Sequence, residues 1–464
     1  MGSAALDLSK TEAFLKGVRI PFVSPSATEF GVLSKTFMHS PEQPTGIAQP
    51  GTAEEVATII KHCIAEKVPF VVRTGGHDVT KSTLVANVLS INLRKLDHVQ
   101  VSADKKTARV GGGILSGALL EALAPHGLEV PTAAVPSVGW LSCATMAGYT
   151  LMSPSMGLCC DSLLGAKVVD AKGEIVEASE RMMKGIRGGG GNFGVIVEFT
   201  VKVHPLLEAQ SGAIMYESSD PQRSWSSFLT KFQELMTKEK MPHCLSILPS
   251  LIAVPNMGPA VFAVFYWRGA RDDAFQYWLK KAGSLGQAVV DLDKAVVTQS
   301  ALTFTKGFEA LLPPKMYGAI HSSCGSELTP EAIEVFGKYG AAMPPAGGSS
   351  INFHVLREGT PSCGKPSDFP DSVFGARRPH WMCEFIGGSG AGEEQGAEAA
   401  QWAKEIRDAL AKTGAVTKFG YAATTSKEFA VVEDVFGENA AELRALKKEF
   451  DPDNVFRCTV PLMD

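Results

Sequence analysis

The sequence lacks any Cys-x-x-Cys pair, any run of lysine or arginine, and any apolar stretch near the roughly 20 residues that cross a bilayer. Without Cys-x-x-Cys spacing, the usual zinc and thioredoxin-like sites are not indicated, and we expect no bound metal. The nine cysteines, an odd number scattered along the chain, fit free thiols in a reducing compartment. A formal net charge of -5 without basic runs argues against nucleic acid and against a membrane surface as partners.

The first residues also lack a charged start followed by an apolar run, which predicts that no secretory signal is present. Together with the scattered cysteines, this favours a cytoplasmic location. The 464 residues are 45% hydrophobic and 20% charged. This ordinary globular composition is sufficient for more than one domain.

Hydrophobic periodicity predicts alternating helices and strands, with a change of pattern after Pro205 that indicates an α+β chain carrying an inserted central segment. The clearest helix start is Thr52, which is expected to cap a helix with Glu55 three residues later. Residues 11–40 show no sustained period and are expected to be irregular. Strands are expected at 68–73, 89–93, 107–111, 195–203, 259–267 and 380–386, with a hairpin at 166–177. Helices are expected at 50–64, 117–125, 272–282, 394–413 and 440–450.

The segment Val71–Asp78 directly follows a predicted strand and contains the adjacent glycines Gly75 and Gly76. Such glycines let a backbone approach a ligand closely and turn its N–H groups toward phosphate oxygens. His77 lies at the tip of this loop, and functional residues are often found in such positions. On this pattern alone, a solvated or structural histidine after a Gly-Gly turn is the better explanation.

A second glycine-rich segment matches the Gly-x-Gly-x-x-Gly spacing of dinucleotide-binding folds through Gly189, Gly191 and Gly194. That fingerprint needs a strand before the glycines and a helix after them. Here no strand is predicted before the run, and a strong strand pattern follows it at Val195. The order is wrong, so a Rossmann-type site is rejected.

The combination of motifs is more specific than any one of them. The chain contains, in order, the loop at 71–78, Val130–Gly139, Gly157-Leu158 with Asp161, the run at 187–195, and Phe450–Phe456. In this order and spacing they resemble the berberine-bridge-enzyme-like FAD-linked oxidoreductases of the vanillyl-alcohol-oxidase (PCMH-type) superfamily. The resemblance covers residues 41–205 and 438–456, whereas the middle of the chain resembles the family only at 384–388.

The resemblance implies an α+β fold with two domains. A PCMH-type FAD-binding domain, made of two α/β subdomains, is expected at residues 1–205 and 422–464. An inserted substrate-binding domain, with an antiparallel sheet covered by helices, is expected at residues 206–421.

The resemblance also implies that the cofactor is FAD, attached by one covalent bond between His77 and the flavin 8α-methyl group. Such a bond prevents loss of the cofactor and raises its electron affinity. The residues carried over as cofactor contacts are Arg73, Thr74, Gly75, Gly76, His77 and Asp78 in a pyrophosphate loop, Ser137, Val138, Gly139, Ser142 and Thr145 in a second stretch, Val195 on the adenine side, and Asn454 in the C-terminal return.

The second stretch departs from the family pattern. Val135 stands where many members have a cysteine that forms a second flavin bond, so one attachment is expected. Cys143 stands where histidine is usual, and a small buried residue is its better interpretation. Met146 and Ala147 fill positions that are usually glycine, which leaves room for a different seating of the cofactor.

Two residues are candidates for catalysis. The resemblance places Tyr421 over the flavin as a proton-handling group ionised by a neighbouring cation, although Ala423 replaces the usual asparagine. A packed tyrosine with a satisfied hydroxyl explains Tyr421 equally well. Glu384 is the second candidate, as a base with a raised pKa, although an edge salt bridge is the simpler explanation. His354 and His321 are weaker candidates, for which a structural role is simpler.

Alternation along the strand at 380–386 divides its side chains between two faces. Trp381, Cys383 and Phe385 are expected on one face of the sheet. The other face is expected to carry His380, Met382 and Glu384.

The predicted function is an FAD-dependent oxidase of a small organic alcohol or amine, such as a secondary-metabolite intermediate. The expected reaction combines hydride transfer to flavin, proton removal by a protein base, and reoxidation by molecular oxygen. An apolar substrate would suit the central segment, although an ordinary core explains these residues even better: Met257, Phe262, Phe265, Trp267, Phe304 and Phe308. The alternatives are a non-oxidative isomerase or cyclase on the same scaffold, and a flavin-free binding protein.

Overall fold

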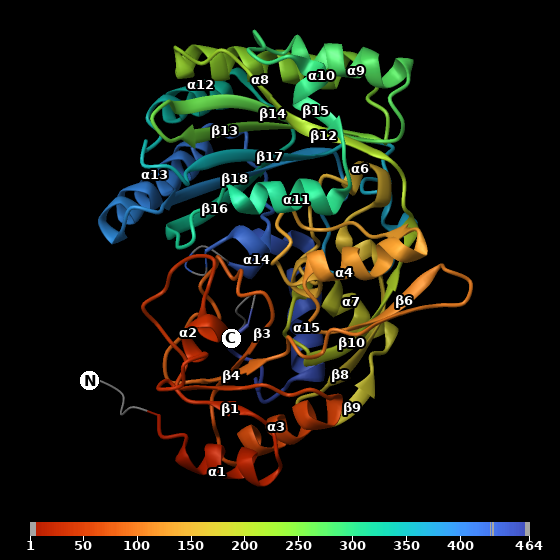
Figure 1. The fold of residues 1–464 in the computed structure, drawn as a ribbon, viewed down its shortest axis with the longest axis vertical. Helices are drawn as coiled ribbons and strands as arrows, with labels where there is room; N and C mark the ends of the chain where they lie inside the picture. Colours follow the sequence, from red (N-terminus) through yellow and green to blue (C-terminus); the bar gives the residue numbers. More distant parts are fainter. Residues whose placement is uncertain (1–5, 427, 429–430, 460–464) are drawn as a thin grey trace.

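The chain forms two lobes, and its first and last helices, α1 (Ser9–Gly17) and α15 (Ala440–Phe450), both lie in the lower one (Figure 1). The computed structural model describes residues 6–426, 428 and 431–459. The lower lobe contains two sheets from the first part of the chain, and the upper lobe contains one large sheet from the middle. The α+β class expected from the sequence is confirmed. Within the described part of the chain, no helix is long and apolar enough to cross a membrane.

A small sheet in the lower lobe supports the glycine loop. Its strands, in spatial order, are β1 (Phe22–Val23), β2 (Gly46–Ala48), β4 (Leu89–Asn92) and β3 (Phe70–Arg73). Strands β2, β4 and β3 run parallel, whereas β1 pairs antiparallel with β2. Helix α3 (Ala53–Ala65) begins at the predicted cap, where the Thr52 hydroxyl accepts a hydrogen bond from the Glu55 N–H. The glycine loop therefore starts at the carboxyl end of β3.

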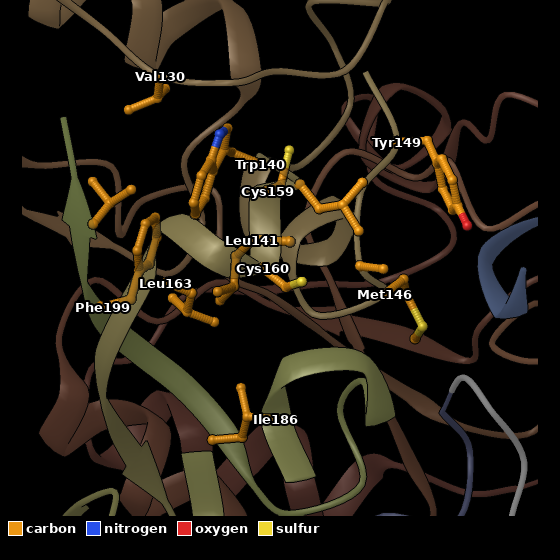
Figure 2. Packing of buried hydrophobic residues seen from close by; sticks show 14 of the residues in the cluster. Val130, Trp140, Leu141, Met146, Tyr149, Cys159, Cys160, Leu163, Ile186 and Phe199 are labelled. Atoms are coloured by element: carbon orange, nitrogen blue, oxygen red, sulfur yellow. The ribbon is translucent and has the colours of Figure 1, made fainter. Parts of the chain in front are cut away.

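The second sheet is antiparallel and contains the predicted hairpin. Its strands, in spatial order, are β5 (Val99–Val101), β6 (Thr107–Gly111), β10 (Val195–Lys202), β8 (Leu163–Val169) and β9 (Ile175–Glu177). Helix α7 (Glu180–Gly189) precedes the second glycine run and β10 follows it, so the absence of a Rossmann-type order is confirmed. In the core beside this sheet, Trp140 of α5 (Trp140–Ala144) stacks on Phe199 with ring centroids 5.0 Å apart (Figure 2).

The upper lobe is a seven-stranded antiparallel sheet with helices on its outer face. Its strands, in spatial order, are β15 (Val296–Thr298), β12 (Ala209–Met215), β14 (Gly258–Arg268), β13 (Leu245–Val254), β17 (Ser350–Leu356), β18 (His380–Ser389) and β16 (Tyr317–Gly325). The outer helices are α8 (Pro221–Lys238), α9 (Asp273–Gly283), α12 (Pro330–Ala341) and α13 (Glu393–Ala411). The inner face looks toward the lower lobe, with α11 (Ala301–Ala310) between the sheet and α4 (Ser116–Leu123) (Figure 1).

Several further elements of the chain are short. They are β7 (Leu128–Glu129), which pairs with β11 (His204–Pro205), and the helices α6 (Ser153–Met156), α10 (Leu292–Ala295) and α14 (Val432–Phe436).

The predicted alternation along β18 is confirmed. Trp381, Cys383 and Phe385 are buried in the core beneath the outer helices, whereas Met382 belongs to the core shared with the lower lobe. Glu384 is therefore on the inner face. The cross-strand partners of Glu384 on that face are Asn352 of β17 and Ser322 of β16, so the inner face carries a group of polar side chains.

Residues 11–40 are not irregular throughout, contrary to the sequence expectation. They contain most of α1 (Ser9–Gly17) and all of α2 (Phe30–Ser34). Helix α1 buries only Thr11 and Leu15, too few residues to produce a readable period. Its Phe14 stacks on a histidine of α3 at a centroid distance of 4.1 Å. Tertiary packing rather than local pattern stabilises this short helix.

The end of the chain returns to the lower lobe and is fixed there by a buried ion pair. Lys447, on the predicted last helix α15 (Ala440–Phe450), lies 2.6 Å from Asp451, and the two side chains are 6% and 0% exposed. Lys447 Nζ also donates to the carbonyl oxygens of Asn192 and Phe456 at 3.1 and 3.2 Å. The Asp451 carboxylate accepts from two backbone N–H groups of the following turn. This network joins the C-terminal segment to the loop that follows α7.

We predict that Lys447→Met lowers the free energy of unfolding by roughly 3–5 kcal/mol, because the Asp451 carboxylate would stay buried without its cation. The matched control is Lys238→Met, which breaks an exposed pair with Glu234 at the same i,i+4 spacing and should change stability little. Denaturant unfolding followed by tryptophan fluorescence measures both variants. Equal losses in the two would contradict a stabilising role for the buried pair.

Candidate functional site

The glycine loop after β3 and the segment before α5 approach each other backbone to backbone. A Cβ on Gly75 would collide with the Ser137 carbonyl oxygen and lie 2.6 Å from the Gly139 nitrogen. Only glycine fits at Gly75 without moving one of these segments. At this junction, where the glycine loop meets the segment before α5, Thr74 Oγ1 lies 3.0 Å from Ser142 Oγ. The structure thus brings these residues, predicted from two distant parts of the sequence, together.

Gly76 and Val138 contribute to the junction through their backbones. Gly76 has a φ of 77°, a left-handed conformation that favours glycine. The Val138 carbonyl oxygen accepts a hydrogen bond of 2.9 Å from the Ser116 N–H at the start of α4. The second segment is therefore fixed to α4 while it contacts the glycine loop.

Two arginines next to the glycine loop have no carboxylate partner among the described residues. Arg73 donates to two carbonyl oxygens at the end of α2, one of them at 3.0 Å, and its Nε is buried without a hydrogen-bond partner. Arg94 donates to the carbonyl oxygens of Thr74 and Gly75 at 2.8 and 3.4 Å. Burial, and then the nearby Arg94, lower the pKa of Arg73 to about 10. Two such cations suit a multiply charged anion such as a pyrophosphate.

His77 lies at the tip of the loop and contacts the second segment. Its Nε2 is 2.9 Å from Ser137 Oγ, and its ring stacks on Phe37 at a centroid distance of 4.9 Å. Ser137 Oγ in turn donates to the carboxylate of Glu309 on α11, so these contacts reach the upper lobe. Burial, followed by the two neighbouring arginines, lowers the pKa of His77 to about 4. The imidazole is therefore neutral at neutral pH.

The hydrogen bonds of Asp78 and Thr145 stabilise the segments on either side of the junction and add no contact between the glycine loop and the segment before α5. The Asp78 carboxylate accepts hydrogen bonds from the N–H and hydroxyl groups of Thr80 and Thr83, which turns it back into its own loop. The Thr145 carbonyl oxygen accepts from the N–H groups of Gly188 and Gly190 at 2.9 and 3.0 Å. The second of these contacts ties α5 to the glycine run that follows α7.

Val195 and Asn454 lie apart from the junction. Val195 begins β10 and is buried in the core that also contains Phe70 and Phe456. Asn454 has a φ of 49° and turns the chain toward that core just before Phe456. Since Phe70 belongs to β3, these residues secure the strand from which the glycine loop emerges.

The two candidates for catalysis come together at the inner face of the large sheet. The Tyr421 ring lies edge-on to Tyr149 at a centroid distance of 4.9 Å. Burial raises the pKa of Tyr421, and the nearby Cys143 and Glu384 raise it further. Cys143 is on α5, next to Ser142, which contacts the glycine loop. Helix α5 therefore links the Tyr421 cluster to the glycine loop.

The expectation that a neighbouring cation ionises Tyr421 is wrong. The groups that affect its hydroxyl are thiols, a carboxyl group and another phenol, and each of them raises the pKa. A neutral phenol donates one hydrogen bond and does not act as a base near neutral pH. Tyr421 is therefore suited to orient a polar group rather than to remove a proton.

The edge salt bridge considered for Glu384 is also wrong. Strand β18 is interior, paired with β17 on one side and β16 on the other. Among the described residues no cation pairs with Glu384, and burial raises the pKa of its carboxyl group to about 7. The side chain still keeps partial solvent contact. A carboxyl group of this kind is well placed to accept a proton near neutral pH.

Sequence reasoning missed the Tyr149–His380 pair beside Tyr421. Tyr149 Oη lies 2.7 Å from His380 Nε2, and His380 Nδ1 lies 2.8 Å from the Arg378 carbonyl oxygen. Because a carbonyl oxygen only accepts, Nδ1 carries the hydrogen and Nε2 accepts from the Tyr149 hydroxyl. Alternation placed His380 on the inner face. No local signal could connect it with a tyrosine 231 residues away.

His354 lies in this cluster, and His321 does not. The His354 ring is 6.2 Å from that of Tyr149, burial lowers its pKa to about 4, and its Nδ1 has no hydrogen-bond partner among the described residues. His321 faces the outer helices, where Arg407 and Asp408 of α13 affect its pKa. This position supports a structural role for His321.

The residues that replace family glycines are accommodated locally. Ala147 is fully buried with a φ of 79°, a left-handed conformation that costs a residue other than glycine roughly 1–2 kcal/mol. Met146 is buried in the core shown in Figure 2. Cys143 is only half-buried, and its Sγ lies 4.0 Å from that of Cys159, without a disulfide. Cys143 is therefore less buried than the expected small buried residue, although it packs against the core of the lower lobe.

The apolar residues singled out in the central segment do not share one role. Phe265 and Trp267 belong to the core beneath the outer helices, and Met257 is 61% exposed. Phe304 and Phe308 pack on each other along α11, at a centroid distance of 5.2 Å. Only some of the apolar residues singled out in the central segment can therefore line the inner face of the sheet.

A cavity of about 870 Å³ opens elsewhere, beside the long loop between β17 and β18. Its lining mixes Lys202 and Lys365 with Glu358 and Asp368, so it shows no preference for one charge. None of the residues of the glycine loop lines this cavity. We therefore assign it no ligand.

Two family models match the chain at the regions just described. The model for the FAD binding domain matches residues 44–179, and the model described as berberine and berberine like matches residues 420–461. The first contains the glycine loop and α5. The second begins at the residue before Tyr421.

Curated relatives cover most of the chain. An FAD-linked oxidoreductase of Gibberella zeae, aurO, is 31% identical over 426 residues, which are 89% of this chain and 80% of the relative. The (R)-6-hydroxynicotine oxidase of Paenarthrobacter nicotinovorans is 26% identical over 438 residues, 90% of each protein.

Solved structures share the fold along nearly the whole chain. The berberine bridge enzyme of Eschscholzia californica superposes with a TM-score of 0.82 at 20% identity, covering 98% of this chain and 99% of that one. The 6-hydroxy-D-nicotine oxidase of Arthrobacter nicotinovorans gives a TM-score of 0.77 at 23% identity, covering 95% and 97%.

We predict that Gly75→Ala weakens FAD binding about tenfold or more, the equivalent of roughly 1.4 kcal/mol. The added Cβ would push the glycine loop away from the backbone at Ser137 and Gly139. Gly31→Ala is the control, because a Cβ there meets no atom within 4 Å. FAD titration followed by flavin fluorescence measures both variants. Unchanged affinity in Gly75→Ala would contradict the close-approach argument.

We also predict that Glu384 titrates near neutral pH. Since burial raises its pKa to about 7, the carboxyl group is protonated below that pH and ionised above it. The infrared C=O band of a carboxylic acid should disappear as the pH rises through about 7, and should be absent in Glu384→Gln. Glu217→Gln, which removes a carboxylate outside the site whose pKa is lowered, should leave the band intact. An unaltered band in Glu384→Gln would refute the assignment.

Proposed function

The chain belongs to the berberine-bridge-enzyme-like FAD-linked oxidoreductases of the PCMH-type fold, and on that premise we propose that it oxidises a small apolar alcohol or amine. The observation that carries this proposal is the partly buried Glu384 carboxyl group beside Tyr421, connected through α5 to the glycine loop. We propose residues 1–205 and 422–464 as the FAD-binding domain and residues 206–421 as the substrate-binding domain.

The residues at the junction fit FAD. Gly75 leaves room only for backbone beside the second segment, and an added Cβ would fill that space. Arg73, with its unpartnered Nε, and Arg94 supply positive charge for a pyrophosphate. In our proposal the loop from Arg73 to Gly76 holds the phosphates, and His77 bonds to the flavin. Val195 and Asn454 support the adenine side.

When bound, FAD supplies the acceptor for a hydride. Glu384 would accept the proton that the substrate hydroxyl or amine gives up, since its pKa of about 7 matches that task near neutral pH. The neutral Tyr421 would donate a hydrogen bond that orients the substrate heteroatom. The Tyr149–His380 hydrogen bond would hold the Tyr149 ring against Tyr421.

A single flavin bond is part of the proposal. Val135 has no nucleophile, and Cys143 lies close enough to Tyr421 to raise the pKa of its hydroxyl. Molecular oxygen is the proposed electron acceptor. A cytoplasmic location is supported by nine free cysteines, including two whose sulfur atoms are 4.0 Å apart without a bond.

An apolar substrate is supported by the inner face of the sheet. Beside the polar Asn352 and Ser322, the face carries Phe262 and Ile386, both only partly buried. Glu384 is the charged group among these neighbours. A secondary-metabolite intermediate with one hydroxyl or amine group would match this lining better than a polyhydroxylated sugar.

Among the residues that the structure describes, no contact specifically favours a non-oxidative isomerase or cyclase. The relatives are named as oxidoreductases and oxidases, which supports the redox reaction. The decisive assay offers apolar alcohols and amines without oxygen. Bleaching of the flavin, and peroxide release on admitting air, are the expected results. Product of unchanged mass with no bleaching would establish the isomerase, and a colourless chain that does not take up FAD would refute both enzymes.

We predict that the yellow colour stays with the polypeptide after denaturation and that His77→Ala abolishes this retention. The bond to the imidazole cannot form in the variant, whereas the remaining contacts of the junction still bind FAD. Absorbance of the denatured, washed protein measures the effect. His126→Ala, at an exposed histidine after α4, is the control. Retention of colour in His77→Ala would assign the attachment to another residue.

A further inference from the structure

The hydrogen-bond chain from His77 through Ser137 to Glu309 has a direction. Ser137 has one hydroxyl hydrogen and donates it to the Glu309 carboxylate, which only accepts. The Ser137 oxygen therefore meets His77 Nε2, 2.9 Å away, as an acceptor. In a neutral imidazole, Nε2 then carries the single hydrogen and Nδ1 keeps its lone pair. Nδ1 forms no hydrogen bond within the described part of the chain, so it is the nitrogen available to react.

The surroundings of His77 oppose a positive charge on its ring. Arg94 and Arg73 both lie close enough to lower its pKa, and Phe37 covers one ring face. A bond from Nδ1 to carbon makes the imidazole cationic unless Nε2 loses its proton. The hydrogen bonds through Ser137 lead that proton away from the arginines and to a carboxylate.

We propose that Glu309, acting through Ser137, sets the tautomer of His77 and takes up its Nε2 proton while the bond to FAD forms. This inference rests on the proposed covalent attachment through His77. The Nδ1–carbon bond forms as one C–H bond of the flavin 8α-methyl group breaks and its proton leaves to solvent. The two electrons remain on the isoalloxazine ring until molecular oxygen removes them. Ser137 and Glu309 are positioning residues for this step.

The two ends of the hydrogen-bond chain belong to different lobes. Glu309 is on α11, which packs between the large sheet and α4, whereas His77 and Ser137 belong to the lower lobe. The same helix carries Lys306, which pairs with Glu121 of α4 at 2.8 Å. Lys306→Ala therefore removes another contact of α11 with the lower lobe without touching His77, and it is the matched control.

The experiment follows the rate at which the full-length chain, produced without flavin, bonds to added FAD. Samples are denatured at intervals, and the flavin fluorescence that stays with the polypeptide is measured. FAD binding before denaturation is measured separately, at saturating cofactor. Because a positioned proton acceptor contributes roughly 10²–10⁴-fold, Glu309→Gln and Ser137→Ala should slow bond formation by about 10²-fold or more.

Conservative and rescued variants separate a proton relay from a packing effect. Ser137→Thr keeps the hydroxyl and should retain most of the rate, and Lys306→Ala should match the unmodified chain. In Glu309→Ala, added formate should restore bond formation because it supplies the missing carboxylate. Variants that bind FAD normally but bond slowly, with rescue by formate, establish the relay.

The experiment distinguishes failure of the proton relay from failure of the covalent attachment through His77. If the unmodified chain bonds FAD through His77 and Glu309→Gln does so at the same rate, the relay is refuted and the proposed attachment stands. Slow bonding in Lys306→Ala, or no rescue by formate, also refutes the relay, because α11 would then act only by packing. If the unmodified chain never retains flavin, or retains it in His77→Ala, both the attachment and the relay are refuted.

Discussion

Glycine at positions 75 and 139 allows two chain segments, separated by some sixty residues, to touch through their backbones. The rest of the site depends on this contact, because it brings His77 to Ser137 and Thr74 to Ser142. The carboxyl end of β3 fixes one segment, and α4 and α5 fix the other. A site built on strand and helix ends in this way keeps its geometry better than one carried by free loops.

The inner face of the large sheet supplies the other half of the site. Outer helices bury the apolar face of that sheet, which leaves the inner face free to carry polar groups. Glu384 occupies an interior strand, where neighbouring strands exclude much of the water that would stabilise its charge. The same burial that makes Glu384 costly to ionise brings its pKa into the range useful for proton transfer. Helix α5 connects this mixed face, where Phe262 and Ile386 lie beside the polar groups, to the glycine loop.

Local sequence patterns predicted the elements whose capping residues and buried positions can be recognised within the element itself. Helix α3 was readable because Thr52 caps it and its buried residues recur at helical spacing, and alternation placed Glu384 on the correct face of β18. The family resemblance supplied the glycine loop and Tyr421. Helix α1 was missed because its stability comes from contact with α3 rather than from its own sequence. Tyr149, His380 and Glu309 were missed as site residues because each acquires its role only through a partner far along the chain.

The return of the C-terminal helix has a consequence for biosynthesis. Lys447 and Asp451 secure the turn that places Phe456 against β3, so the lower lobe lacks part of its core until α15 and this turn have been synthesised. The upper lobe, whose strands run from Ala209 to Ser389, has all its strands earlier on the ribosome. Since domains generally fold as units while the chain emerges, the middle of the protein would mature first. Insertion of the cofactor then becomes a late event, because it waits until α15 has packed on the lower lobe.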